Sequence, residues 1–148
     1  MNTIRALIVD DEPPARDELA YLLAQYPDVV TSQAQNAHQA LEAIRNTAPD
    51  LVFLDIHMPG EDGFHVLEKC LDMAEPPLFI FVTAYDKYAV RAFAENALDY
   101  LLKPISDERL SLSMERAREH LSMRTDNQST KAELASLLSA LSREGAKD

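Results

Sequence analysis

The fold is decided by residues 4–14, which read IRALIVDDEPP. The first six of these residues are mostly apolar, have the length of a β-strand, and run directly into Asp10, Asp11 and Glu12. A helical pattern from Ala15 to Gln25 follows Pro13 and Pro14, and proline suits a helix start because the N–H groups of the first turn have no intrahelical partner. A strand, an acidic turn and a helix in this order predict the first half of a β-α-β unit.

The same alternation continues along the chain. Further short apolar runs stand at residues 29–32, 51–54, 78–82 and 98–102, and helical patterns stand at 37–46, 63–73, 87–95 and 107–124. Five strands that alternate with five helices predict an α/β fold whose parallel sheet is covered on both faces. Because ligands of such sheets bind at the carboxyl ends of the strands, functional side chains are expected there.

Composition excludes several classes of function. The 148 residues carry a net charge of −11 and include one cysteine and three glycines, too few glycines for the common nucleotide-binding loops. All of the acidic excess lies in residues 1–100, with 6 Lys/Arg against 17 Asp/Glu, which argues against direct contact with DNA. The chain shows neither a membrane-span pattern nor a signal-peptide pattern, so we expect a cytoplasmic protein that does not contact membranes.

Polar side chains follow four of the five predicted strands. Asp10 and Asp11 follow the first, Asp55 the third, Thr83 ends the fourth, and Lys103 follows the fifth. Three neighbouring carboxylates repel one another, which raises their pKa values, and a hard divalent cation relieves that repulsion. An aspartate beside a cation, a lysine and a hydroxyl group is arranged to attack phosphorus.

Four segments of the chain together resemble the receiver domain of bacterial two-component response regulators. They are Val9-Asp10-Asp11-Glu12, Asp55-Ile56-His57-Met58-Pro59-Gly60, Val82-Thr83-Ala84 and Leu102-Lys103-Pro104. The resemblance covers residues 3 to about 122 and implies a flavodoxin-like (βα)5 fold with strand order 2-1-3-4-5.

Two further segments, residues 83–89 and 97–104, resemble the LytR/AlgR subgroup of these regulators. Members of that subgroup carry a C-terminal DNA-binding domain of the LytTR type, which does not fit in the residues that follow. We therefore expect a receiver excised from a longer regulator, with a natural stand-alone receiver as the alternative. The expected organisation is a receiver domain at 1–122, a polar linker at 123–130 and a helical tail at 131–148.

The resemblance implies a role for each residue at the strand ends. Asp55 takes a phosphoryl group from a sensor histidine kinase, and Asp10, Asp11 and Asp55 hold Mg²⁺ (or Mn²⁺) together with the backbone carbonyl of His57. Thr83, the amide of Ala84 and Lys103 contact the phosphoryl oxygens.

Three further residues are expected to act around this site. Tyr100 occupies the aromatic switch position, where a half-buried ring is expected, and the peptide before Pro104 is expected to be cis. Tyr85 lies two residues beyond Thr83, and we expect it to control the access of water to the phosphoryl group.

The predicted function is therefore signalling rather than enzymatic catalysis, apart from reactions of the domain on itself. Phosphorylation is expected to control homodimerisation, through the face of the fourth helix, fifth strand and fifth helix or through the tail, and so transcription. The main alternative is a receiver-shaped interaction module that is never phosphorylated, although no acid or lysine of the motif is lost. A phosphatase and a flavin carrier fit less well: His57 stands where a phosphatase needs an acid, and Glu12-Pro13-Pro14 replaces a flavin-binding loop.

Overall fold

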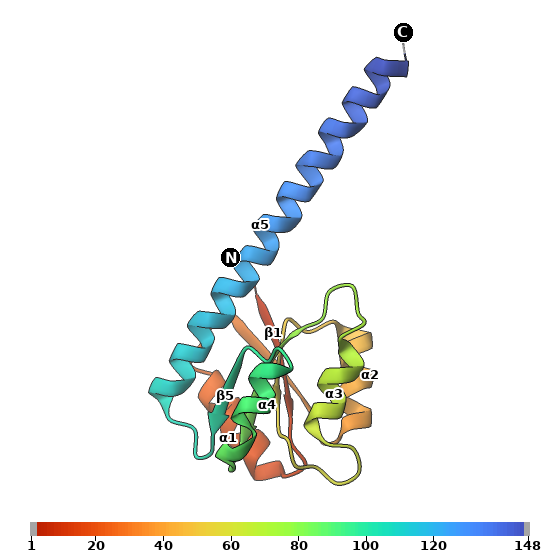
Figure 1. The fold of residues 1–148 in the computed structure, drawn as a ribbon. Helices are drawn as coiled ribbons and strands as arrows, with labels where there is room; N and C mark the ends of the chain where they lie inside the picture. Colours follow the sequence, from red (N-terminus) through yellow and green to blue (C-terminus); the bar gives the residue numbers. More distant parts are fainter. Residues whose placement is uncertain (1–2, 147–148) are drawn as a thin grey trace. The chain divides into compact units, whose positions relative to one another are not determined.

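Five parallel strands form one sheet in the order β2-β1-β3-β4-β5 (Figure 1). The strands are β1 (Ile4–Val9), β2 (Val29–Ala34), β3 (Leu51–Leu54), β4 (Leu78–Thr83) and β5 (Asp99–Leu102). The helices are α1 (Pro13–Leu23), α2 (Ala37–Thr47), α3 (Gly63–Cys70), the 3-10 turn η1 (Asp86–Tyr88), α4 (Ala89–Ala94) and α5 (Asp107–Ala146). The predicted flavodoxin-like (βα)5 class and strand order are confirmed.

This computed structural model describes residues 3–146, with the side chains of residues 90, 125–133, 135–136 and 139–146 left out. The chain divides into two compact units, residues 1–114 and 115–148.

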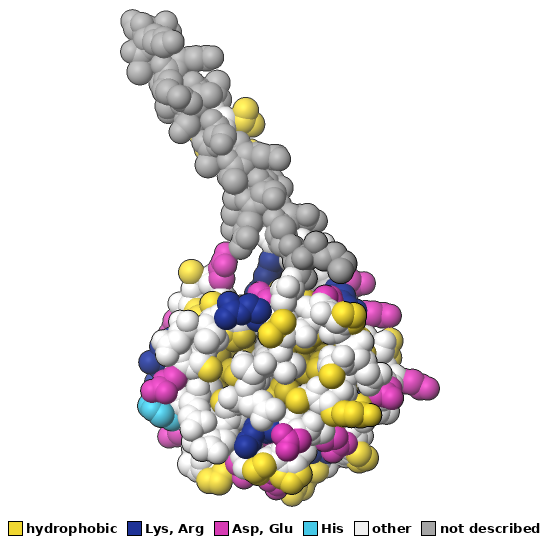
Figure 2. Space-filling model, turned by 180° about the vertical axis from the view of Figure 1, so that it is seen from behind, with side chains coloured by type: hydrophobic (Ala, Val, Ile, Leu, Met, Phe, Trp, Pro, Cys, Tyr) yellow, Lys and Arg dark blue, Asp and Glu magenta, His cyan; other side chains and the backbone are white. Residues whose placement is uncertain are grey.

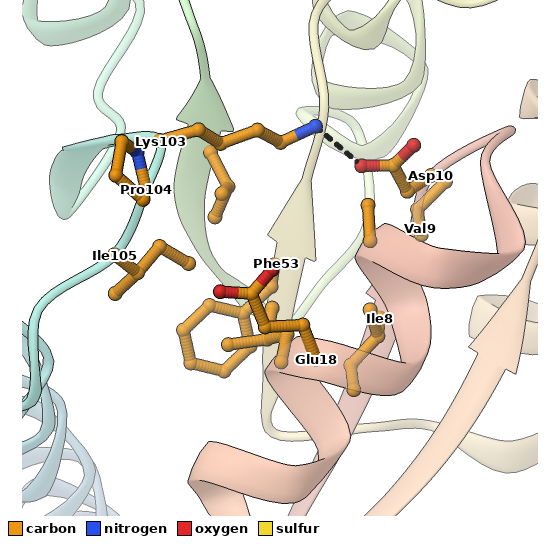
Figure 3. Close-up of a pocket in the computed structure, with 11 residues that line it drawn as sticks. Ile8, Val9, Asp10, Glu18, Phe53, Lys103, Pro104 and Ile105 are labelled. Carbon is orange, nitrogen blue, oxygen red and sulfur yellow. Dashed lines mark hydrogen bonds and ion pairs between the residues drawn. The ribbon is translucent and has the colours of Figure 1, made fainter.

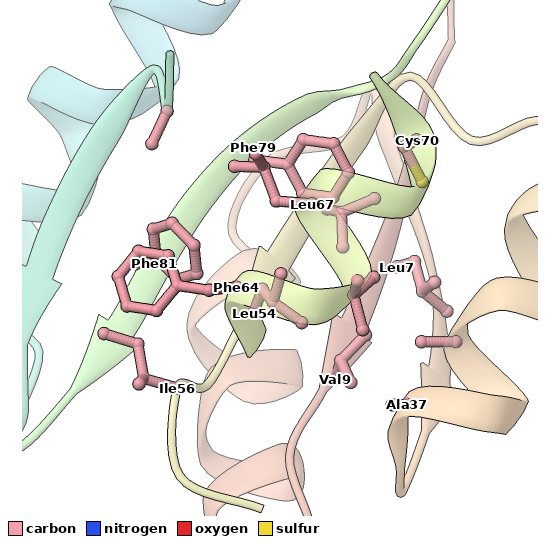
Figure 4. Packing of buried hydrophobic residues seen from close by; sticks show 14 of the residues in the cluster. Leu7, Val9, Ala37, Leu54, Ile56, Phe64, Leu67, Cys70, Phe79 and Phe81 are labelled. Atoms are coloured by element: carbon pink, nitrogen blue, oxygen red, sulfur yellow. The ribbon is translucent and has the colours of Figure 1, made fainter. Parts of the chain in front are cut away.

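The main hydrophobic core of the first unit lies between the sheet and helices α2, α3 and α4. Alternate strand residues such as Leu7, Val9 and Leu54 are buried against α2 and α3, and Phe64 of α3 stacks at 4.7 Å between ring centroids on Phe81 of β4 (Figure 4). Helices α2 and α3 lie side by side over this face (Figure 1). Because both faces of the central strands are covered, β3 and β4 read as continuous apolar runs.

The other face of the sheet carries the remaining strand residues, including Ile8, Phe53 and Ile80, each at most 1% exposed. The buried Leu19 and Leu23 of α1 and the buried Leu110 of α5 belong to this second layer of the core. The surface is mixed: on the face shown in Figure 2, hydrophobic side chains gather in the middle of the globular unit and charged side chains lie mainly around its margin.

Two helical predictions need correction. The pattern at 87–95 forms the turn η1 followed by the short helix α4. The backbone is extended at Tyr85, just before η1, and it has a left-handed conformation at Asn96, just after α4, where φ is 69°. The predicted break at 125–130 is also wrong, because α5 continues through it to Ala146. No proline or glycine stands between Pro104 and Gly145, so nothing in this stretch interrupts a helix strongly.

In the second unit, the described side chains of the tail leave three leucines largely exposed. Leu134, Leu137 and Leu138 are 54%, 62% and 65% exposed, and they lie at helical spacings of three and four residues. The side chain of Leu141, which continues this spacing three residues after Leu138, lies outside the described residues.

Candidate functional site

The carboxyl ends of four strands bring the predicted site residues to one edge of the sheet. Asp10 follows β1 and Asp55 follows β3, and the N–H of Asp55 donates to the carbonyl of Val9 at 3.0 Å, which aligns the two strand ends. The N–H of Lys103 donates to the carbonyl of Thr83 at 2.8 Å, which does the same for β4 and β5. Parallel pairing therefore converts four separate positions in the sequence into one cluster.

The carboxylates of Asp10, Asp11 and Asp55 form a compact acidic cluster. One oxygen from each lies within 4.8 Å of the others, and Asp10 and Asp55 are buried, 5% and 7% exposed. Oxygens that bind an octahedral Mg²⁺ at about 2.1 Å lie no more than about 4.2 Å apart, so small side-chain movements suffice to place all three on one ion. The donor set fits a hard divalent cation.

Lys103 is the cation of the site. Its Nζ lies 2.7 Å from Oδ2 of Asp10 and 3.5 Å from Oδ2 of Asp55, so one ammonium group bridges two of the three acids. Burial acts to lower the pKa of Lys103, but the hydrogen bond to Asp10 and the charge of Asp55 outweigh it and raise the pKa. The ammonium form is therefore secure at neutral pH.

Asp55 has an unusual acidity. Its pKa rises from 3.8 to about 6, first because burial disfavours the charged carboxylate and also because Asp10 repels it, while Lys103 acts in the opposite direction. The sequence predicts a raised pKa from mutual repulsion of the acids; the larger cause is burial.

Thr83, Tyr85 and Tyr100 are linked by hydrogen bonds on the β4 and β5 side of the sheet edge. Thr83 is 1% exposed, and its hydroxyl accepts a weak hydrogen bond from the Tyr85 N–H at 3.4 Å, whereas Ala84 is exposed. The hydroxyl of Tyr100 donates to the carbonyl of Tyr85. Tyr100 is only 7% exposed, so the expectation of a half-buried ring is wrong: the ring is buried, and its hydroxyl is tied to the loop after β4.

Aromatic rings gather around His57, two residues after Asp55. The exposed His57 meets Tyr85 edge-on at 5.0 Å and Tyr88 at 5.1 Å between ring centroids. Nζ of Lys87 lies 5.1 Å from the ring centroid of Tyr88, a distance that suits a cation–π contact. Tyr85, expected near the site because it lies two residues beyond Thr83, thus contacts His57, which follows Asp55 by two residues.

The backbone of Asp55 is held by the close approach of Gly63. The N–H of Gly63 donates to the carbonyl of Ile56 at 2.9 Å, and a Cβ at residue 63 would lie 2.3 Å from the carbonyl oxygen of Asp55. Only glycine permits that approach. The peptide bond between Lys103 and Pro104 is cis, as the resemblance implies.

A cavity of about 260 Å³ adjoins the site on the α1 side of the sheet (Figure 3). Ile8, Phe53 and Ile105 supply apolar walls, and the ion pair of Lys103 with Asp10 lies at its rim. The stem of Lys103 therefore contacts the cavity while its ammonium group serves the acidic cluster.

Sequence reasoning missed an ion pair beside Tyr100. Asp99, which is fully buried, accepts hydrogen bonds from Arg109 at 2.6 and 2.9 Å and from the hydroxyl of Ser113 at 2.5 Å. Burial acts to raise the pKa of Asp99, but these hydrogen bonds outweigh it and lower the pKa. An aspartate inside an apolar strand was the available signal, since a buried acid needs a partner.

The part of the chain that the structure describes has no helix both long and apolar enough to cross a membrane.

Comparison with known proteins identifies the family of the chain. The family model described as "Response regulator receiver domain" matches residues 6–115. "Sensory transduction protein LytT" of Enterococcus faecalis is 44% identical over 119 residues, which are 80% of this chain and 49% of that protein. "Transcriptional regulatory protein BtsR" of Salmonella typhi is 42% identical over 131 residues, 84% of this chain and 54% of that protein. The chain thus spans about half the length of these curated relatives.

Solved structures share the fold. The response regulatory domain of protein mrkE from Klebsiella pneumoniae superposes with a TM-score of 0.75 at 27% identity and covers 81% of this chain and 99% of that one. Chemotaxis response regulator CheY4 of Vibrio cholerae has a TM-score of 0.70 at 21% identity, with 78% and 99% covered, which supports the fold alone.

The chain belongs to the response regulator receiver family. Its curated relatives include regulators of the LytT type, in agreement with the LytR/AlgR resemblance of residues 83–89 and 97–104. Members of this family are signalling domains, and their acidic pocket generally binds Mg²⁺.

Proposed function

We propose that this domain accepts a phosphoryl group from a sensor histidine kinase on Asp55, with Mg²⁺ (or Mn²⁺) held by Asp10, Asp11, Asp55 and the backbone carbonyl of His57. The observation that carries the proposal is the cluster of three carboxylates, with one oxygen of each within 4.8 Å of the others and two of them bridged by the ammonium group of Lys103. An ordinary surface aspartate would have neither the neighbouring acids nor the lysine.

The acidity of Asp55 suits a nucleophile. With a pKa of about 6, more than nine-tenths of the carboxyl group is ionised at pH 7.5. An ionised oxygen attacks phosphorus, the new O–P bond forms as the P–N bond of the donor phosphohistidine breaks, and the imidazole nitrogen keeps the electron pair and takes up a proton. When bound, Mg²⁺ supplies positive charge for the phosphoryl oxygens.

Thr83, the Ala84 N–H and Lys103 are the proposed partners of the transferred phosphoryl group. Lys103 is already 3.5 Å from Asp55, and Thr83 ends the strand next to the one that Asp55 follows. The Thr83 hydroxyl, which now accepts a hydrogen bond from the Tyr85 N–H, would also donate one to a phosphoryl oxygen. Its reorientation would change its contact with Tyr85. Tyr100, tied to the carbonyl of Tyr85, would respond to that change.

The response is proposed to reach the face built by α4, β5 and the first turns of α5. A cavity of about 330 Å³ lies on this face, lined by Tyr100 and its neighbours, among them Ala89, Phe93, Leu102 and Arg109. Phe93 and Leu102 are about half exposed, at 49% and 46%, so this face offers apolar surface to a second copy of the chain. The tail leucines offer a second route to a homodimer.

The full regulator is proposed to work in the cytoplasm and to contact DNA only through a LytTR-type domain outside this sequence. The support is the length of the curated relatives, about twice the matched region, and the acidic character of residues 1–100. We also propose that the chain is organised by function into a receiver at 1–122, a linker at 123–130 and a tail at 131–148. Helix α5 is continuous across both of these boundaries.

An intact-mass measurement tests the phosphoacceptor role. Incubation with acetyl phosphate and Mg²⁺ should add about 80 Da to the protein, the mass of one phosphoryl group, and neither EDTA-treated protein nor Asp55→Asn should gain it. Asp72→Asn, which changes an exposed acid after α3, is the matched control and should be labelled like the wild type. Absence of labelling in the wild type would refute the proposal and favour the interaction module.

Tyr85 is proposed to shield the acyl phosphate from water. Tyr85 lies in the loop that follows Thr83, is 52% exposed, and contacts His57 edge-on. Tyr85→Ala should therefore shorten the lifetime of phosphorylated Asp55, measured by loss of the added mass after the donor is removed. Tyr21→Ala, at a 77% exposed tyrosine of α1, is the control; an unchanged lifetime in Tyr85→Ala would contradict the shielding role.

A further inference from the structure

Asp10 makes three hydrogen bonds that hold the turn carrying two of the three acids. The Asp10 N–H donates to the carbonyl of Ala34 at 3.2 Å, Oδ1 accepts the N–H of Glu12 at 3.0 Å, and Oδ2 accepts Lys103 at 2.7 Å. Among the described residues, the Asp11 carboxylate has no hydrogen-bond or ion-pair partner, although it is one of the three acids of the cluster. The direction of Asp11 is therefore left to the backbone that leads to it.

Arg16 holds that backbone. Its Nη1 donates to the carbonyl oxygen of Asp10 at 2.7 Å, and its Nε donates to Oε1 of Gln33 at 3.2 Å. Arg16 lies in the first part of α1, and Gln33 lies near the end of β2, so one guanidinium group joins the helix to the ends of two strands. The carbonyl of Asp10 belongs to the peptide plane that also contains the N–H of Asp11.

A peptide unit is planar and nearly rigid. When its carbonyl oxygen is fixed, the dihedral ψ of Asp10 is fixed, and with it the direction in which Asp11 leaves the strand end. Binding sites tolerate errors of only about 0.5 Å or 10–20° in their ligand groups. A residue that orients this peptide therefore determines how well the Asp11 carboxylate meets those of Asp10 and Asp55.

We propose that Arg16 is a positioning residue of the cation site: its hydrogen bond to the Asp10 carbonyl orients the Asp10–Asp11 peptide, and so sets the affinity of the three carboxylates for a divalent cation. This inference rests on the proposed function for the presence of the cation. The side-chain hydrogen bonds of Arg16 go to the Asp10 carbonyl and to Gln33, so Arg16 acts on the cation site through the Asp10–Asp11 peptide.

Arginine has a specific advantage here. Its planar guanidinium offers several N–H donors in fixed directions, so Gln33 can hold the group in the plane that points Nη1 at Asp10. A lysine at residue 16 keeps the charge and N–H donors on a single nitrogen, but it loses the fixed geometry of the guanidinium plane. Arg16→Lys should therefore recover only part of the function, and Gln33→Met should weaken the orientation without removing the bond to Asp10.

Mn²⁺ binding, followed by water proton relaxation, measures the effect directly. Arg16→Met should raise the Mn²⁺ dissociation constant about tenfold, the low end of what loss of a ligand-orienting partner costs, with Arg16→Lys and Gln33→Met between it and the wild type. In acetyl phosphate labelling, the half-saturating Mg²⁺ concentration should rise by the same factor, while the rate at saturating Mg²⁺ changes little. The amide resonance of Asp11 in EDTA should shift in Arg16→Met.

Arg45→Met is the matched control, because Arg45 is an exposed arginine in the last turn of α2, which leads toward the amino end of β3. It should bind Mn²⁺ like the wild type. A folded Arg16→Met with wild-type Mn²⁺ affinity would overturn the inference. If that variant does not fold, Arg16→Lys and Gln33→Met decide the question, and wild-type affinity in both would overturn it equally.

The two proposals fail in different ways. A wild type that binds Mn²⁺ but gains no mass from acetyl phosphate would refute phosphoryl transfer and leave the role of Arg16 to be decided by the affinities. A wild type that is labelled, together with an Arg16→Met variant of unchanged affinity, would refute the role of Arg16 alone.

Discussion

Replacing Asp55 by asparagine should stabilise the folded domain at neutral pH, because the fold pays a cost to keep this buried carboxyl group ionised. Its pKa rises from 3.8 to about 6, chiefly through burial. A carboxyl group with a raised pKa holds its proton more tightly in the folded state than in the unfolded state. The free energy of unfolding therefore falls as pH rises from about 4 to above 6, and stays lower beyond that.

The size of the effect follows from the two pKa values. The difference between 3.8 and about 6, converted at ~1.36 kcal/mol per pH unit, comes to about 3 kcal/mol at pH 7.5. The same relation leaves about 2 kcal/mol at pH 5.5 and less than about 1 kcal/mol at pH 4. Lys103 retains its 2.7 Å contact with Asp10, so the substitution does not leave the ammonium group without a counter-charge.

Urea unfolding followed by tyrosine fluorescence is the assay. All five tyrosines lie within residues 1–114 and no tryptophan is present, so the signal reports on this unit. EDTA removes the contribution of divalent cations, and pH 7.5, 5.5 and 4 avoid the isoelectric point near 4.7. Asp72→Asn should show no such gain. An Asp55→Asn protein no more stable than the wild type at pH 7.5, or a gain that does not shrink on acidification, would refute the reasoning.

Three further predictions concern stability and metal binding. Gly63→Ala puts a Cβ 2.3 Å from the Asp55 carbonyl, so it should cost about 1–3 kcal/mol in urea unfolding and slow labelling; wild-type stability would contradict that contact. Arg109→Met removes the hydrogen bonds at 2.6 and 2.9 Å to the buried Asp99 and should lower the free energy of unfolding by about 3–5 kcal/mol. A loss below about 1 kcal/mol would show that Ser113 and the backbone are enough to stabilise the Asp99 carboxylate. Mg²⁺ at ten times its dissociation constant should raise the wild-type free energy of unfolding by about 1.4 kcal/mol at pH 7.5. The same Mg²⁺ concentration should give a smaller gain at pH 5.5, because Asp55 is mostly protonated there. Equal gains at both pH values would contradict the role of the Asp55 carboxylate.

Much of the site was predictable because its residues stand at strand ends. In a parallel sheet every carboxyl end lies at the same edge, so Asp10, Asp55, Thr83 and Lys103 had to meet once the strands were recognised. The apolar runs were readable for the same physical reason, since strands buried on both faces need apolar side chains throughout. The phosphoacceptor assignment itself stays a prediction until labelling is measured.

The length of α5 was not predictable from the cluster of polar residues at 125–130. Asparagine, serine and threonine lower helix stability only slightly, and a helix without proline or glycine continues when its neighbours favour it. The opposite error was made at 87–95, where an apparent helix divides into a 3-10 turn and a helix of six residues. The local sequence pattern indicates only the helix propensity of a segment, whereas the residues at which a helix begins and ends depend also on tertiary packing.

The sequence by itself determined the fold class, the edge of the sheet that carries the site and the identity of its acids and its lysine, because periodicity and strand ends are local properties of the chain. Only the tertiary structure decided which groups bond to one another: Arg16 to the Asp10 carbonyl and Arg109 to Asp99. It also decided that the pKa of Asp55 rises mainly through burial. Hydrogen bonds and acidity depend on distances of a few ångströms and on the exclusion of water, and both arise only when segments remote in sequence are packed together.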